Sequence, residues 1–81
     1  MGMTEGLTNM ADMHKVASSN IDSIGYDKVT STLYISFLSS GMYKIHPVDE
    51  ATFHAMEASK SKGKFYNSTI KSNPDYKIER V

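Results

Sequence analysis

Alternating apolar and polar residues predict three short strands in the first part of the chain. The clearest alternation sets Leu33, Ile35 and Phe37 against their neighbours, so that one side of this strand can face a core. Ser39-Ser40-Gly41 supplies a turn to the next strand, because glycine adopts positive φ without steric cost. The pattern therefore predicts a three-stranded antiparallel meander. Its strands span Ile21 to Tyr26, Thr32 to Phe37 and Met42 to His46.

After the third strand the apolar spacing changes to one that is typical of a helix. Pro47 ends the strand, and Asp49 stands where an N-cap carboxylate can accept hydrogen bonds from the free amides of a first turn. Val48 and Phe53 have the spacing of a hydrophobic staple. These features predict a helix from Glu50 to about Ser59. Its inward stripe is predicted to comprise Thr52, Ala55, Met56 and Ser59.

A second, shorter helix is predicted from Lys64 to Lys71, with Gly63 as the break between the two helices. Asn73-Pro74-Asp75 ends this helix, because the residue before a proline is biased away from the helical region. The tail from Tyr76 to Val81 alternates and leaves room for an edge strand. The inward side chains of the second helix are predicted to be Phe65 or Tyr66, and Ile70.

These elements predict a single small domain of the α+β class. It would be a three-stranded antiparallel β-meander followed by two α-helices packed on one face, with a short C-terminal strand left open. A chain of 81 residues cannot divide its apolar side chains between two cores. Residues 1–16 contain two glycines and no sustained period, so they are expected to form a flexible lead without a role in the fold, and residues 17–81 the domain.

The composition excludes several kinds of chemistry. The chain has no cysteine, which excludes disulfides, thiolate nucleophiles and thiolate zinc sites, and agrees with a reducing compartment. No stretch approaches the roughly 18 apolar residues of a membrane-spanning helix, and the N-terminus lacks the blocks of a secretory signal. We therefore expect a cytoplasmic protein with no membrane partner.

The remaining residue types do not assemble a catalytic motif. His14, His46 and His54 have no carboxylate or third ligand at a recognisable interval, so neither a metal site nor a cofactor is predicted. No serine stands in a nucleophile elbow or pairs with a histidine and an orienting carboxylate. The string Ser61-Lys62-Gly63-Lys64 lacks the two spaced glycines of a phosphate-binding loop. The sequence favours binding over catalysis.

The formal net charge of zero conceals a polarised chain. Residues 1–59 contain three basic and seven acidic side chains, whereas residues 60–81 contain six basic and two acidic ones. This asymmetry indicates an anionic partner for the C-terminal part.

Two groups of residues are candidates for contact with nucleic acid. In the first, lysines alternate with Phe65 and Tyr66, and cations can neutralise phosphates while rings stack on bases. Solvated helix ends are the alternative. In the second, Tyr34 would point outward beside Lys44 or His46, either as a stacking platform or as an ordinary surface residue. The candidate set comprises Lys60, Lys62, Lys64, Tyr66, Lys71, Tyr34 and Lys44.

Several short strings, taken in order, resemble the KTSC domain family from about Ala17 to Val81. They are Ser19 to Asp27, Thr32 to Phe37, Gly41-Met42-Tyr43, Val48 to Ala58, Ser61 to Asn67, Ile70 and Tyr76. The resemblance assigns motif positions to Ile24, Gly25, Tyr26, Tyr43, Gly63 and Asn67. The chain departs from the family at its central Tyr-x-Tyr motif, where it has Tyr43-Lys44-Ile45.

The resemblance implies a function but no established activity. The family takes its name from the C-terminus of some lysyl-tRNA synthetases and also occurs as small bacterial and phage proteins, a setting that suggests RNA binding. Our first hypothesis is thus a noncatalytic RNA- or DNA-binding module. The alternative is a bacterial or phage accessory or inhibitor protein that docks on a host protein or captures a small nucleotide. The sequence leaves the oligomeric state open.

Overall fold

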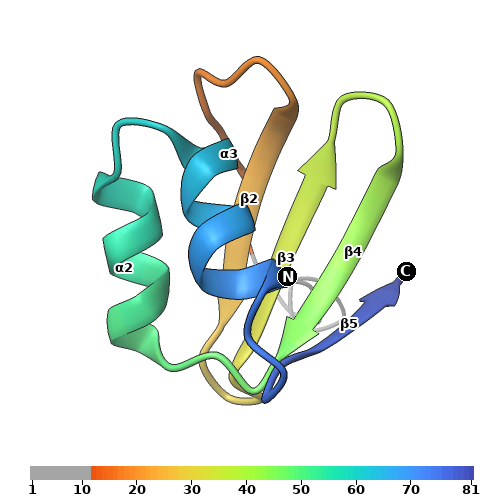
Figure 1. Cartoon of the computed structure of the whole chain (residues 1–81). Helices are drawn as coiled ribbons and strands as arrows, with labels where there is room; N and C mark the ends of the chain where they lie inside the picture. Colours follow the sequence, from red (N-terminus) through yellow and green to blue (C-terminus); the bar gives the residue numbers. More distant parts are fainter. Residues whose placement is uncertain (1–11) are drawn as a thin grey trace, which may run out of the picture.

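The computed structural model describes residues 12–81, which form one antiparallel sheet covered on one face by helices (Figure 1). The strands lie side by side in the order of the sequence, from β1 to β5. The α+β class and the meander are confirmed, but the sheet has five strands where three and an optional tail were expected. The strands are β1 (His14–Lys15), β2 (Ile21–Asp27), β3 (Thr32–Phe37), β4 (Gly41–His46) and β5 (Lys77–Arg80).

The additional strand β1 comes from the segment that the sequence assigned to a flexible lead. Residues 1–11 of that lead lie outside the described part of the chain. His14 and Lys15, however, pair antiparallel with Ile24 and Ser23 of β2, and Val16 packs against the core. The structure therefore differs from the expectation that nothing up to Val16 takes part in the fold. Two residues are too few to show a period, so only the pairing with β2 reveals this strand.

An irregularity in β2 explains how Ile21 and Ile24 both reach the core. In a regular strand, residues three apart point to opposite faces. Here the register with β3 shifts between Ile21 and Ser23. An extra residue of this kind returns the chain to the same face, as in a β-bulge. Both isoleucines are consequently almost completely buried.

The helical layer consists of α2 (Glu50–Ala58), α3 (Lys62–Phe65) and the π-helix η1 (Tyr66–Lys71), which continues α3 without a break. Asp49 is confirmed as the N-cap of α2, since its carboxylate accepts a hydrogen bond from the Thr52 amide at 2.9 Å. The predicted break at Gly63 is wrong. Ser61 caps α3 by accepting from the Lys64 amide at 3.2 Å, so this helix begins at Lys62 and Gly63 lies in its first turn.

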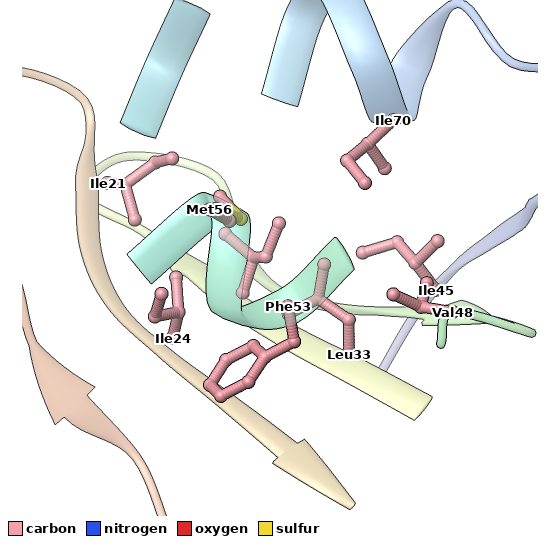
Figure 2. Close-up of a cluster of buried hydrophobic side chains, with 9 residues drawn as sticks. Ile21, Ile24, Leu33, Ile45, Val48, Phe53, Met56 and Ile70 are labelled. Atoms are coloured by element: carbon pink, nitrogen blue, oxygen red, sulfur yellow. The ribbon is translucent and has the colours of Figure 1, made fainter. Parts of the chain in front are cut away.

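Figure 2 shows the core between the sheet and the helices. Phe53 and Met56 are the buried residues of α2, so the predicted stripe holds only at Met56. The row omits Phe53, which lies one position away from it, but the burial of Phe53 and Val48 agrees with the staple spacing. Ile70 of η1 is fully buried, and Phe65 and Tyr66 are both partly buried against the core. The buried apolar set is Ile21, Ile24, Leu33, Ile35, Ile45, Val48, Phe53, Met56 and Ile70.

The register of the sheet assigns the central side chains to its two faces. Leu33 pairs with Ile45, and both face the helices with 0% exposure. Tyr34 pairs with Lys44 on the opposite face. No helix within residues 12–81 combines the length and apolar character that a membrane crossing requires.

Truncation of the central strand tests the core. Leu33→Ala should lower the free energy of unfolding by about 2–5 kcal/mol, because it leaves a cavity at a fully enclosed position. Denaturant unfolding measures this loss. The control Ser36→Ala lies on the same strand but on the other face, and it should change stability by no more than about 0.5 kcal/mol. Equal losses for the two variants would contradict the assigned faces.

The cap of α2 makes stability depend on pH. Hydrogen bonding from Thr52 lowers the pKa of Asp49 below its ordinary value of 3.8. Because the folded-state pKa lies below the unfolded one, the contribution is present above 3.8 and is lost as the pH falls through the folded-state pKa. Asp49→Ala should therefore lower the Tm at neutral pH. The difference in Tm between this variant and the unmodified protein should become smaller in acid. Asp75→Ala, whose carboxylate bonds to no described residue, should lower the Tm less and without this narrowing.

Candidate functional site

One end of the molecule carries two adjoining hollows. The loop before β2, the β3–β4 turn and the start of α3 meet at this end, at the top of Figure 1. The first hollow, of about 350 Å³, lies between the loop before β2 and the connection from α2 to α3, and we name it the lysine hollow. It is lined by Ala17, Ser18, Ser19, Asn20, Lys60, Ser61, Lys62, Gly63, Lys64 and Asn67.

The second hollow, of about 410 Å³, contains three aromatic rings, and we name it the aromatic hollow. Phe37 stands between the two tyrosines, with its ring edge-on to Tyr43 at 5.7 Å and to Tyr66 at 5.2 Å between centroids. All three rings pack partly on the core and remain partly exposed. The aromatic hollow is lined by Asn20, Phe37, Ser39, Ser40, Tyr43, Tyr66, Asn67 and Lys71.

Burial shapes the chemistry of one of these tyrosines. Desolvation raises the pKa of Tyr66, and the neighbouring Tyr43 adds to the shift. Like an ordinary phenol, Tyr66 is protonated at neutral pH and can donate a hydrogen bond, and the raised pKa moves its ionisation further from neutrality. The hydroxyl of Tyr66 is therefore a neutral donor beside the stacking surface.

The electrostatic character of both hollows is positive. None of the described residues that line them is acidic. Lys60, Lys64 and Lys71 are exposed and form no ion pair or hydrogen bond through their ammonium groups with any described side chain. Lys62 is different, because its ammonium donates to the Ser59 carbonyl at 2.8 Å, at the end of α2. Three cations are thus available to an anionic ligand.

The wall that the hollows share is built by the turn at Ser18 and Asn20. The Ser18 hydroxyl donates to Asn20 Oδ1 at 3.1 Å and accepts from the Ile21 amide at 3.1 Å. The Asn20 carbonyl accepts from the Leu38 amide at 2.9 Å, which ties this loop to the end of β3. A side chain at Gly63 would collide with this wall, since a Cβ there would lie 2.7 Å from Asn20 Oδ1. Gly63 therefore lets α3 approach Asn20 closely.

Five of the seven predicted binding residues line the hollows, and two do not. Lys60, Lys62 and Lys64 line the lysine hollow, and Tyr66 and Lys71 the aromatic one. The second predicted group lies on the opposite face of the sheet, where Tyr34 pairs with Lys44 and Lys44 approaches Glu79 at 3.8 Å. That Tyr34 points outward beside Lys44 is confirmed, but the two groups do not form one surface.

The histidines lie apart from the hollows. His54 is exposed on α2 and lies 3.5 Å from the Glu50 carboxylate and 3.2 Å from that of Glu57. The expectation that no carboxylate stands at a recognisable interval from a histidine is therefore wrong for His54, because residues three and four apart are neighbours on a helix. His14 belongs to β1 and His46 ends β4. Within residues 12–81, no group of three side chains of the metal-binding types is arranged to hold an ion.

Three of the six motif positions serve the fold. Ile24 is fully buried in the core. Gly25 lets the chain before β1 pack closely against β2, because a Cβ at this position would lie 2.7 Å from the Asp12 carbonyl oxygen. The Tyr26 hydroxyl donates to the Val48 carbonyl, and its ring stacks on Phe53 at 5.1 Å between centroids.

The comparisons with known proteins agree with this architecture. The model of the KTSC domain matches residues 17–76. This chain belongs to the KTSC domain family. The crystal structure of a KTSC domain protein from Yersinia pestis has 30% sequence identity to it and a TM-score of 0.83, and the match covers 89% of this chain and 99% of that one. No match was found among proteins with curated descriptions.

The other three motif positions, Tyr43, Gly63 and Asn67, all lie at the hollows. The departure from the KTSC Tyr-x-Tyr motif falls at Ile45, which is fully buried under the helices. Ile45 lines neither hollow. The replacement of the second tyrosine of the motif therefore changes the core and leaves the lining of the hollows unchanged.

Sequence reasoning missed the residues that complete the hollows. Ser18 and Asn20 look like ordinary turn residues before a strand, and Phe37 looks like a core residue. Nothing in their spacing connects them to Lys60 or Tyr66. Only the packing of α3 against the loop before β2 brings them together.

A double-mutant cycle at Gly63 and Asn20 tests the shared wall. Alanine is favoured over glycine inside a helix by about 1 kcal/mol, but the methyl group of Gly63→Ala would displace the Asn20 amide. Gly63→Ala should therefore stabilise the protein less in the natural background than in Asn20→Ala, where no amide obstructs it. Denaturant unfolding of the four proteins measures the difference. Equal gains in both backgrounds would show that the two residues do not touch.

Proposed function

We propose that this KTSC domain is a noncatalytic module that binds single-stranded nucleic acid, RNA in particular, across the two hollows. One observation carries the proposal. Lysines and aromatic rings line two adjoining hollows at one end of the fold, and no described lining residue is acidic. Cations that follow a phosphate backbone, with rings on which bases stack, are the usual means of binding a single strand.

The chemistry of the lining favours an unpaired strand over a duplex. Rings at the floor of a hollow can reach only bases that are unstacked, as they are in RNA loops and ends. The naming of the family after the C-terminus of some lysyl-tRNA synthetases supports RNA as the ligand. The absence of cysteine from the chain suits a cytoplasmic site of action.

Docking on a protein is the competing function, and the outer edge of β5 supports it. Lys77–Arg80 pairs with β4 on one side and ends the order of the described strands on the other. An unpaired strand edge can accept an extended segment of a partner. A stoichiometric bacterial protein that stays bound after nuclease treatment, together with no RNA binding, would favour this function instead.

Salt dependence tests the binding of RNA. With three lysines on phosphates, log K for a single-stranded oligonucleotide should fall with log salt at a slope of about −2, or roughly twenty-fold between about 50 and 200 mM. Lys64→Gln should weaken binding and make the slope shallower by about 0.7. Fluorescence anisotropy at several salt concentrations measures both quantities.

Lys77→Gln is the matched control for this experiment. Lys77 pairs with His46, next to the pair of Ile78 with buried Ile45, and so lies on the face of the sheet opposite the hollows. Its substitution removes the same charge and should leave the slope unchanged. If single strands, duplexes and tRNA all fail to bind at low salt, the proposed function is wrong.

A further inference from the structure

We infer that the two hollows form one composite site for a single nucleotide unit, with the phosphate in the lysine hollow and the base in the aromatic hollow. The inference rests on the proposed function and adds to it the ligand class, its orientation and the residues that hold each half. It starts from the division of chemistry between the two hollows. Among the described lining residues, the lysine hollow has no aromatic ring, and the aromatic hollow has one cation, Lys71.

The lysine hollow suits a phosphate. Lys60 and Lys64 supply two ammonium groups, while Ser19 and Ser61 add hydroxyls to the same lining. A phosphate has several strong acceptor oxygens and carries negative charge at neutral pH, so a set of donors without a competing carboxylate matches it. The lysine hollow has a volume of about 350 Å³, which lies within the range of roughly 300–1,000 Å³ that small-ligand clefts occupy.

The aromatic hollow suits a base. Tyr43 and Tyr66 approach Phe37 edge-on, so the three rings form a fixed cluster supported by the core beneath. A rigid aromatic surface of this kind loses little conformational entropy when a base stacks on it. The hydroxyl of Tyr66, a lining residue, adds a hydrogen-bond donor that is neutral at physiological pH.

Two asparagines join the halves, because Asn20 and Asn67 line both hollows. Asn20 already accepts from Ser18, which fixes it as part of the wall. The side-chain amide of Asn67 makes no hydrogen bond to any described residue, and Asn67 is exposed where the two hollows adjoin. An amide offers a donor and an acceptor side by side, which matches the edge of a base. We therefore assign Asn67 to the base edge and Asn20 to the support of the wall.

The composite site predicts how fragments of a nucleotide divide between the hollows. In NMR titrations of the full chain, inorganic phosphate should shift the amide signals of Lys60 to Lys64, and adenosine those of Tyr43 and Tyr66. Adenosine 5′-monophosphate should shift both sets and bind at least about tenfold more tightly than either fragment, because the two contacts then act in one molecule.

Substitutions separate the halves of the site. Lys64→Gln should weaken the monophosphate and leave adenosine unchanged, and Asn67→Ala should weaken both by about fivefold through the lost hydrogen bonds. Tyr66→Leu removes a ring from the hollow, and its matched control Tyr34→Leu removes one from the opposite face of the sheet. If Tyr66→Leu does not fold, the exposed positions Lys64 and Asn67 still provide the test.

The outcomes distinguish a failure of the inference from a failure of the proposed function. If the monophosphate shifts only the signals that phosphate shifts, while RNA binding keeps its dependence on Lys64, the composite site is wrong and RNA binding stands. If the monophosphate shifts both sets but RNA does not bind, the site stands as one for a free nucleotide and the proposed function is wrong. If neither ligand binds, both are wrong.

Discussion

Nine buried apolar side chains between the sheet and its helices hold the described part of this protein together. They come from β2, β3, β4, α2, η1 and the link before α2, so no element has a core of its own. Such burial contributes roughly 25 cal/mol for each Å² of apolar surface removed from water, the dominant favourable term in a domain this small. The partly buried rings of Phe37, Tyr43 and Tyr66 pack against this core.

The hollows are a consequence of how this core ends. Phe37, Tyr43 and Tyr66 pack on the margin of the buried set, where the rings stay partly exposed. The same packing holds α3 against the loop before β2, with Gly63 in contact with Asn20. A ligand site built on rings that the core already fixes needs little reorganisation to bind. Stability and the proposed binding thus draw on the same residues at this margin.

The motif of the family divides along the same line. Ile24 packs in the core, and Gly25 leaves room for the chain before β1. Tyr26 bonds to Val48, just before α2. Tyr43 and Asn67 face the hollows. A small domain can carry a structural role and the proposed binding role in one motif, because separate positions of the motif face the core and its margin.

The sequence by itself determined the central meander, the capped helix after Asp49 and the basic character of the C-terminal part. These features depend on neighbours along the chain, namely the alternation at Leu33 and Ile35, the cap and the local count of charges. It did not reveal β1 or the start of α3 at Lys62. Tertiary structure alone decided that the lysines join Tyr43 and Phe37 while Tyr34 and Lys44 lie on the other face. Contacts between residues such as Asn20 and Gly63 leave no period in a sequence, since they depend on how separate elements pack.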